Sequence, residues 1–291
     1  MAPRGLDHIV HAVRDLDAAA EFYRRIGFTV GARNRHPWGT HNYIVQLPGT
    51  FIELLTVAEP SRLGGDTISN LFGRYNRDFL ARGEGLSLLI LESKDAKADV
   101  AEFRRVGIAA AEAVHFEREA KRPDGAPIKV GFSLAFAHDS AAPSTRFATC
   151  QQHYPENFWN PAFQNHANGA KAVRAVVMVA DEPERHRAFA AAFTGSTDFY
   201  NEPGEVSVWT ARGALGIMTP ARFAAAFGGP QPPPGNRLQA VRFAVTDIAA
   251  ARTLVQQAGV RARDWRDGFV IDPADALGAT LSFEPLAKSA A

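Results

Sequence analysis

A short pattern of strand, aspartate, helix and glycine recurs along this 291-residue chain, and the repeat limits the folds open to it. Three copies align without a gap, over residues 5–27, 85–107 and 237–259, and a looser copy spans residues 172–195. In each copy an alternating apolar segment is typical of a strand, and apolar residues at helical spacing follow it. Such repetition indicates a fold assembled from copies of one supersecondary unit.

Aspartates and glycines mark the ends of the repeated helices. An aspartate accepts hydrogen bonds from the free N–H groups of a helix start, and a glycine adopts the left-handed conformation that ends a helix. In the three close copies these residues are Asp15 and Gly27, Asp95 and Gly107, and Asp247 and Gly259. In the looser copy we expect the helix to begin at Asp181, with Pro183 in its first turn, where a missing N–H costs nothing.

Short alternating segments follow each glycine and complete a β-α-β-β-β unit. The clearest of these predicted strands cover residues 28–33, 40–47, 50–57, 205–211, 214–220, 268–272 and 279–286. One unit cannot bury both its helix and a sheet face, so the units should combine in pairs. The sequence therefore predicts an α+β fold of four tandem βαβββ modules, paired into two curved, cup-like sheets with helices outside.

Two stretches indicate how the modules are divided. Residues 160–171 are polar and are expected to join two halves, and the proline-rich stretch 227–235 should form a surface loop between the last two units. We therefore predict an N-terminal domain over residues 1–169, which contains the candidate active site, and a C-terminal domain over residues 170–291 with a degenerate site. Four units make pairing within one chain sufficient, and they leave a homodimer open.

Charge and cysteine content exclude several classes of function. The 32 basic and 31 acidic residues nearly balance, and no basic block is present that would follow a phosphate backbone, so we expect no nucleic-acid partner. Cys150 is the only cysteine, which rules out an intrachain disulfide. No apolar run is long enough to span a bilayer, so we expect no membrane partner and a cytoplasmic location.

A histidine and a glutamate on two predicted strands are the candidate functional residues. His8 lies on the first strand, and Glu53 shares a face with Phe51 and Leu55 that is otherwise apolar. An unpaired carboxylate is costly to bury, so Glu53 needs a cation, a hydrogen-bond network or a metal. A histidine with a carboxylate suits Zn, Fe(II), Mn, Ni or Co. The alternative is a hydrogen-bonded core histidine and a structurally paired carboxylate.

The segments LDHIVHAVRDLDAAAEFYRRIGF and GTHNYIVQLPGTFIELL resemble the opening module of glyoxalase-like members of the vicinal oxygen chelate superfamily. Residues 150–170 are similar to a segment of an uncharacterised glyoxalase-like subgroup. In the superfamily a metal is held by a His on the first strand and a Glu on the last strand of one module, and the paired module supplies further ligands. The resemblance implies that His8 and Glu53 are metal ligands. His41 and Asn42 lie on the neighbouring predicted strand, where they are expected to line the pocket as substrate-binding residues or, alternatively, to form hydrogen bonds at the strand end.

The other modules depart from this pattern. The positions that correspond to His8 and Glu53 hold residues that cannot ligate a metal, or ligate one poorly: Leu88, Ala175 and Ala240 for the first, and Ile217 and Ser282 for the second. The C-terminal half is therefore expected to act as scaffold, lid or interface. A third ligand would come from the last strand of the second module, where His153, Gln151 and Gln152 are candidates. We favour His153, because imidazole binds a metal better than a carboxamide does.

Two hypotheses for function remain. In the first, the N-terminal cleft binds a small oxygen-rich substrate at a divalent metal that acts as a Lewis acid, with lyase, isomerase or dioxygenase chemistry. Glu53 is then a metal ligand or, if it leaves the metal, a general base. In the second, the same cleft binds or sequesters a small molecule without a metal.

Overall fold

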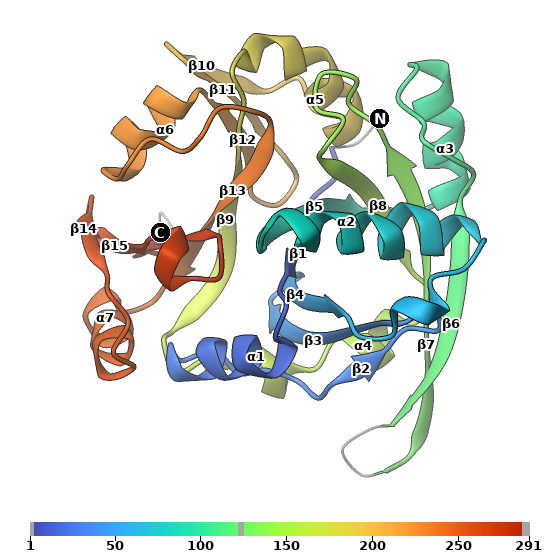
Figure 1. Ribbon diagram of the computed structural model, residues 1–291, viewed down its shortest axis with the longest axis horizontal. Coiled ribbons are helices and arrows are strands. Elements are labelled where there is room, and N and C mark those ends of the chain that lie inside the picture. The colour runs from blue at the N-terminus through green and yellow to red at the C-terminus, as the bar shows by residue number, and fades with distance from the viewer. Residues whose placement is uncertain (1–2, 122–124, 287–291) are drawn as a thin grey trace, which may run out of the picture.

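A computed structural model of the chain describes residues 3–121 and 125–286. It contains two curled eight-stranded sheets, with helices packed on and around them (Figure 1). The first sheet has the order β2-β3-β4-β1-β5-β8-β7-β6 and the second the order β10-β11-β12-β9-β13-β16-β15-β14. Their strands are β1 (Leu6–Ala12), β2 (Asn34–Arg35), β3 (Thr40–Leu47), β4 (Thr50–Val57), β5 (Gly85–Glu92), β6 (Val114–Lys121), β7 (Pro127–Ala137), β8 (Arg146–Gln152), β9 (Ala170–Val179), β10 (Phe199–Glu202), β11 (Glu205–Trp209), β12 (Ala214–Met218), β13 (Arg237–Val245), β14 (Arg263–Trp265), β15 (Gly268–Ile271) and β16 (Thr280–Pro285).

Each sheet consists of two βαβββ modules that pair along their first strands. Within the first module β1 is parallel to β4, and β3 and β2 continue the sheet in antiparallel order. The first two modules join where β1 pairs antiparallel with β5, and the last two join where β13 pairs with β9. The predicted α+β fold of paired βαβββ modules is confirmed, and the pairing takes place within one chain.

The aspartate and glycine signals predict three of the four repeated helices correctly. These are α1 (Leu16–Arg25), α3 (Ala96–Arg105) and α7 (Ile248–Gln257). Asp15, Asp95 and Asp247 each accept a hydrogen bond from a backbone N–H of the first turn. The fourth helix starts differently. Asp181 binds the N–H of Gly235 instead, and a 3-10 turn, η4 (Pro183–His186), precedes α5 (Arg187–Thr194).

One predicted strand is absent from the structure, and several helices were not predicted from the sequence. Residues 28–33 are not a strand; the pairing there is limited to β2. Between the first two modules the chain forms a 3-10 turn, η1 (Pro60–Arg62), a π-helix, η2 (Ser69–Arg74), and α2 (Tyr75–Arg82), which cover the concave face of the first sheet. The remaining helical segments are α4 (Pro155–Phe158), η3 (Pro161–Gln164), α6 (Pro220–Phe227) and η5 (Pro273–Asp275).

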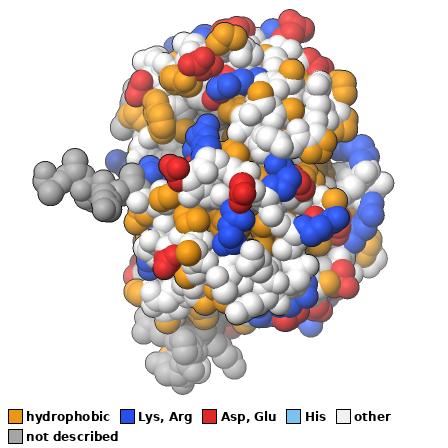
Figure 2. Space-filling view, turned by 90° about the vertical axis from the view of Figure 1, so that its left-hand side faces the viewer, with side chains coloured by type: hydrophobic (Ala, Val, Ile, Leu, Met, Phe, Trp, Pro, Cys, Tyr) orange, Lys and Arg blue, Asp and Glu red, His pale blue; other side chains and the backbone are white. Residues whose placement is uncertain are grey.

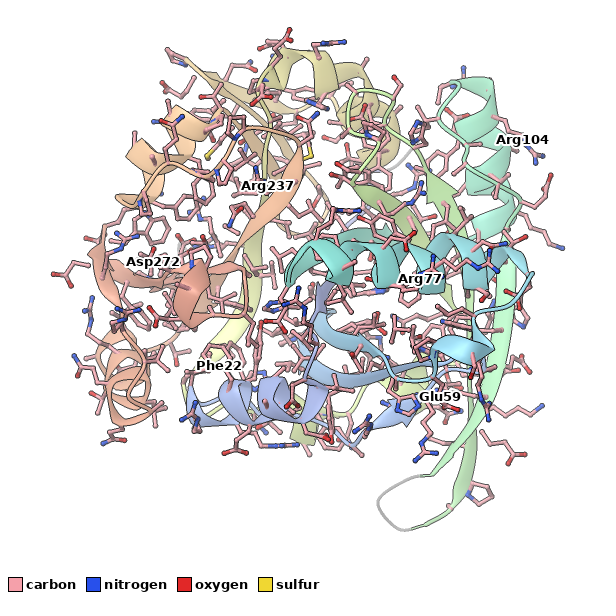
Figure 3. The ribbon with its side chains drawn as sticks, in the orientation of Figure 1. Phe22, Glu59, Arg77, Arg104, Arg237 and Asp272 are labelled. Atoms are coloured by element: carbon pink, nitrogen blue, oxygen red, sulfur yellow. The ribbon has the colours of Figure 1, made fainter. Side chains whose placement is uncertain are left out.

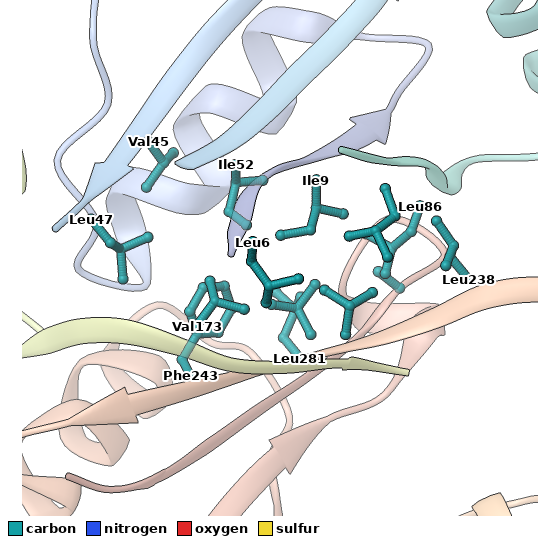
Figure 4. Packing of buried hydrophobic residues seen from close by; sticks show 14 of the residues in the cluster. Leu6, Ile9, Val45, Leu47, Ile52, Leu86, Val173, Leu238, Phe243 and Leu281 are labelled. Atoms are coloured by element: carbon teal, nitrogen blue, oxygen red, sulfur yellow. The ribbon is translucent and has the colours of Figure 1, made fainter. Parts of the chain in front are cut away.

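One hydrophobic core joins the two sheets. Figure 4 shows Ile9, Ile52 and Leu86 of the first sheet facing Phe243 and Leu281 of the second. The concave faces of the sheets therefore point away from this shared core, and each has a smaller apolar cluster of its own. Because the halves share a core, the division into residues 1–169 and 170–291 stays a prediction about domains.

Polar contacts also connect the halves. Asp139, in the loop after β7, forms a buried hydrogen bond with Nδ1 of His186 at 2.6 Å. Gly278 approaches the chain ahead of β5 so closely that a Cβ atom there would lie 2.1 Å from the carbonyl oxygen of Glu84. Gly278 has φ +82, so a larger residue would be strained as well as obstructed. No helix in the described part of the chain is long and apolar enough to cross a membrane.

His11 of β1 is expected to make stability depend on pH. It faces the helix side of its sheet, where Nδ1 hydrogen-bonds the hydroxyl of Tyr23 and Nε2 the carbonyl oxygen of Leu277, each at 2.9 Å. Burial lowers the pKa of His11, although the Leu277 carbonyl and Glu84 act in the opposite direction. The unfolded chain therefore takes up the proton first, and the free energy of unfolding should fall as pH drops below about 6.5, by at most about 1.4 kcal/mol per pH unit for this group.

Urea unfolding of the wild type and of His11→Gln between pH 8 and pH 5 measures this effect. Because His36 and His166 also have lowered pKa values, the difference between the two proteins is the informative quantity. We expect this difference to shrink as the solution is acidified. A difference that stays constant across the range would contradict the assignment to His11.

Candidate functional site

The concave side of the first sheet holds a pocket of about 50 Å³. Helical segments η2 and α4 contribute Phe72 and Phe158 to its wall, the turn between β2 and β3 contributes His36 and Trp38, and the sheet contributes the remainder. The lining is mostly aromatic, with a small polar group on one side. The lining residues are His8, His36, Trp38, Asn42, Ile44, Phe51, Glu53, Phe72, Phe116, Arg118, Phe132, Leu134, Cys150 and Phe158.

Glu53 is the centre of the polar group. Its side chain is almost fully buried on β4, directly beside β1 and β3. The Asn42 side-chain amide donates a hydrogen bond to Oε1 at 2.5 Å, while the nearest histidine nitrogens remain about 4 Å away. Burial raises the pKa of Glu53, and His8, the Asn42 hydrogen bond and Arg118 counteract it only in part. This carboxyl group is thus under-compensated in the protein alone.

His8 presents one ring nitrogen to Glu53. Its Nδ1 lies 2.5 Å from Oδ1 of Asp7, and Oδ2 of Asp7 accepts a hydrogen bond from Gln152 at 2.9 Å. The imidazole also stacks on Phe51, with ring centroids 4.3 Å apart. Nε2 is left facing Oε2 of Glu53 at 3.9 Å. A carboxylate on the outer nitrogen fixes the ring and its tautomer, as it does for many metal-binding histidines.

His36 is a second imidazole at the same carboxylate, and no sequence pattern predicted it. Its Nδ1 hydrogen-bonds Oγ1 of Thr40 at 2.8 Å, its ring stacks on Trp38 at 4.6 Å, and Nε2 lies 4.0 Å from Oε1 of Glu53. Burial lowers the pKa of His36 to about 3, so the ring is neutral at pH 7. It lies in the turn between β2 and β3, where strand alternation cannot place a side chain.

Two of the predicted site residues lie elsewhere. His41 faces the opposite side of β3 from Asn42 and binds Glu59, labelled in Figure 3, at 3.0 Å. His153 is exposed beyond the end of β8, where Nε2 hydrogen-bonds the hydroxyl of Ser133 at 2.8 Å. The structure thus brings His8, Asn42 and Glu53 together, and it does not bring His41 or His153 to them.

The other candidates for a third ligand are also engaged outside the pocket. Gln151 accepts a hydrogen bond from the backbone N–H of Ala96 at the start of α3, and Gln152 binds Asp7. The residue of β8 that reaches the pocket is Cys150, and burial raises its pKa well above the ordinary thiol value. Cys150 is therefore a packing residue rather than a thiolate ligand.

The side chains around Glu53 are of the types that bind a divalent metal, but they lie too far apart for ordinary coordination. Two imidazoles and one carboxylate are ligands that Zn or Fe(II) favours. Ligand bonds to such ions are about 2.1 Å long, so gaps of 3.9 and 4.0 Å could be spanned only at a wide angle. Within residues 3–121 and 125–286, no three His, Cys, Asp or Glu side chains could hold an ion as they stand. Ion binding would have to draw His8, His36 and Glu53 closer.

Helix α6 covers part of the concave face of the second sheet. Phe223 and Phe227 of α6 lie over it, and Phe227 stacks on Trp265 with centroids 5.4 Å apart. The Trp265 indole N–H donates to the backbone oxygen of Ala226, which fastens the helix to the sheet. Ile217, aligned above with Glu53, faces the shared core rather than the cup. Among residues 170–286, no group of three His, Cys, Asp or Glu side chains corresponds to the Glu53 cluster.

A family model described as "Glyoxalase-like domain" matches residues 6–194, which is well over half of the chain. The chain belongs to the glyoxalase-like domain family. The match covers the first sheet with its Glu53 pocket and continues through α5, and the paired βαβββ modules are those of the vicinal oxygen chelate superfamily. No curated protein sequence matches this glyoxalase-like chain.

Solved structures share the fold at low sequence identity. A hypothetical protein from Staphylococcus aureus matches with a TM-score of 0.68 and 14% identity, over 97% of this chain and 100% of that one. A mutant of 4-hydroxymandelate synthase from Streptomyces coelicolor gives 0.52 and 15%, over 90% and 77%. A xylose isomerase-like TIM barrel/4-hydroxyphenylpyruvate dioxygenase fusion protein gives 0.54 and 14%, over 90% and 40%. At such identities the likeness concerns the fold alone.

Proposed function

We propose that this protein binds a small oxygen-rich molecule in the Glu53 pocket, at a divalent metal held by His8, His36 and Glu53. The observation that carries the proposal is the arrangement of the two imidazoles. Each has its outer nitrogen bound, to Asp7 or to Thr40, and each turns the other nitrogen toward a different oxygen of the same buried carboxylate.

A divalent cation bound between the Glu53 carboxylate and the two imidazoles would interact favourably with all three groups. It would neutralise Glu53, whose burial is poorly compensated, and it would accept the free Nε2 lone pairs of His8 and His36. His36 takes the place that the sequence reasoning gave to His153. Asp7 and Thr40 would orient the two rings from behind, and such supporting contacts typically change metal affinity 10- to 100-fold.

The chemistry that follows is polarisation of a substrate carbonyl or hydroxyl oxygen. When bound, a divalent ion supplies Lewis acidity. Glu53 would act as a proton acceptor in a state in which it leaves the ion, since burial raises the pKa of its carboxyl group in the protein alone. Asn42 orients this carboxylate through its side-chain amide, and the aromatic walls limit access of water. These roles are compatible with isomerase, lyase or dioxygenase reactions, among which the fold does not choose.

One observation favours the metal-free alternative, in which the pocket only binds a small molecule. The Asn42 amide nitrogen lies 2.5 Å from Glu53 Oε1 and 3.4 Å from His36 Nε2, so it occupies the position between them. A ligand could join this network through hydrogen bonds alone. The amide would have to turn or move aside for an ion.

Metal binding by untagged protein, purified without chelators, tests the proposal. We expect stoichiometric Zn, Fe, Mn, Ni or Co by elemental analysis, and a visible absorption band when Co²⁺ is added to the apoprotein. His8→Ala should weaken Co²⁺ binding at least about 100-fold, because it removes a direct ligand whereas supporting contacts alone account for 10- to 100-fold. His153→Ala is the matched control, and it should bind Co²⁺ as the wild type does.

Three results would count against this assignment. A wild type that neither contains nor binds a transition metal would favour the metal-free alternative. Loss of Co²⁺ binding in His153→Ala as well as in His8→Ala would restore the ligand set inferred from the sequence, with His153 in place of His36. Unchanged binding in both variants would move the metal away from Glu53. Circular dichroism of each variant separates loss of a ligand from loss of the fold.

A further inference from the structure

Arg118 is a cation in the aromatic wall of the pocket. It lies on β6, the outermost strand of the first sheet, where alternation turns Phe116 and Arg118 toward the pocket and Glu117 to the outer surface. Glu117 is engaged there with the hydroxyl of Tyr154, at 3.0 Å. The guanidinium group therefore faces the same space as Glu53, from the opposite edge of the cup.

The guanidinium group of Arg118 has no hydrogen-bond or ion-pair partner in the described part of the chain. Among residues 3–121 and 125–286, no hydrogen bond or ion pair reaches it, and Glu53 acts on it only through its charge, from beyond ion-pair distance. Burial lowers the pKa of Arg118, which is the sign of a partly desolvated cation. By contrast, Arg242 of β13 binds Glu284 at 2.6 Å and Arg263 of β14 binds Asp272 at 2.7 Å. A charge left half-buried without a counter-ion is costly unless a ligand supplies one.

The rest of the wall favours a flat apolar group. Phe116 packs edge-on against Trp38 at 4.9 Å and against Phe132 at 5.4 Å, and further rings come from Phe51 and Phe158. The space of about 50 Å³ is smaller than most ligand sites, so a ring must displace side chains to enter. Phe116 and Phe132 are only half-buried and lie on the edge strand β6 and its neighbour β7, where displacement is easiest.

Two further polar atoms in the wall also lack partners. The indole Nε1 of Trp38 is a buried donor without an acceptor, and Oδ1 of Asn42 is a buried acceptor without a donor. Unpaired buried groups of this kind are rare in folded proteins. They provide hydrogen-bonding capacity for a ligand that carries both an acceptor oxygen and a hydroxyl or other donor.

We propose that Arg118 binds the carboxylate of the ligand, and that the ligand is an aromatic carboxylic acid whose ring lies among the phenylalanines of the wall. The proposal rests on the proposed function for the choice of pocket, but not for the presence of a metal. Arg118 would act as the specificity-determining residue for acids over neutral analogues. A further oxygen on the ligand would then lie toward Glu53 and Asn42.

Benzoate and benzamide test the proposal, because they share shape and differ in charge. Calorimetric titration of chelator-treated protein should give a benzoate affinity at least about 10-fold higher than that for benzamide, the range expected for a charge-assisted hydrogen bond. Arg118→Met should abolish this preference and leave benzamide affinity within about twofold. Arg118→Lys should retain part of it. Lys129→Met, which removes an exposed cation from the outer face of the neighbouring strand, should behave as the wild type.

The outcomes separate this inference from the proposed metal site. Equal affinity of the wild type for both probes, no binding of either, or a preference that survives in Arg118→Met would overturn the role of Arg118. None of these outcomes depends on the metal, since the titrations are made without one. Conversely, a failed Co²⁺ experiment with an intact Arg118 preference would remove the metal and keep the anion site.

Discussion

Glu53→Gln is expected to weaken Co²⁺ binding at least about 100-fold and, at the same time, to raise the free energy of unfolding by about 1–2 kcal/mol. The first effect follows because the substitution removes the only charged ligand of the proposed set. The second follows because the neutral amide avoids burying an ionised carboxylate that its neighbours compensate only in part. Glutamine keeps an oxygen that can accept the hydrogen bond from Asn42.

Opposite changes in binding and stability are the signature of a residue retained for function at a cost in stability. Co²⁺ titration and urea unfolding at pH 7, each on the apoprotein, measure the two effects. Glu59→Gln is the matched control, because Glu59 is a more exposed carboxylate that binds His41 outside the pocket. It should leave Co²⁺ binding unchanged and should not stabilise the protein. If Glu53→Gln destabilises the fold, Glu53 is a structural partner of Asn42, and the case for a functional carboxylate fails.

Features encoded within a few residues could be predicted from the sequence. Asp15, Asp95 and Asp247 cap their helices because an aspartate can bind free N–H groups two or three positions ahead without help from the rest of the fold. Asp181 occupies the corresponding position in the looser copy, but its side chain accepts a hydrogen bond from the N–H of Gly235, in a distant loop. A local signal thus failed where a tertiary contact competed for the same side chain.

The candidate site could be predicted in part, for a geometric reason. His8 and Glu53 lie on regular strands, so alternation placed both on the concave face. Alternation also means that neighbours on one strand face opposite sides, and so His41 cannot join Asn42 in the pocket. His36 lies in a turn without alternation, and only the folded chain shows that it reaches Glu53.

Arg118 was not predicted as a pocket residue, because it lies among charged residues whose pattern is typical of a solvent-exposed strand. His115, Glu117 and Glu119 on the same strand are indeed exposed. What distinguishes Arg118 is that β6 closes the cup edge, so every second residue faces the pocket. The chemical character of this site therefore depends on the order of strands in the sheet, which the repeat alone does not specify.

The two halves are expected to have different roles, because helix α6 lies over the second sheet while the first sheet holds the Glu53 pocket. The second sheet has its concave face partly covered by α6 and contributes its convex side to the core behind the first sheet. A pocket with a poorly compensated carboxylate and an unpaired arginine costs stability, and burial elsewhere must offset that cost. On this view the C-terminal half supports the pocket energetically without touching the ligand.

Phe243→Ala is accordingly expected to lower the free energy of unfolding of the whole chain by about 3–5 kcal/mol. Phe243, on β13, is fully buried and lies 5.1 Å from Phe28 of the first half and 5.4 Å from Phe283 of its own, by ring centroids. Truncation would leave a cavity where the two sheets meet, so both halves should lose stability together. A matched control is Phe223→Ala, which removes a similar ring from the second cup, away from the shared core.

Single-tryptophan variants that retain either Trp159 or Trp265 allow each half to be followed during urea unfolding. In the otherwise unchanged chain the two transitions should coincide, as they do for one cooperative unit. Phe243→Ala should shift both midpoints downward by the same amount. If only the Trp265 transition moves, the halves unfold independently, and the C-terminal half cannot supply the stability that the Glu53 pocket requires. Coincident transitions would instead explain why a half without a site of its own is part of the protein.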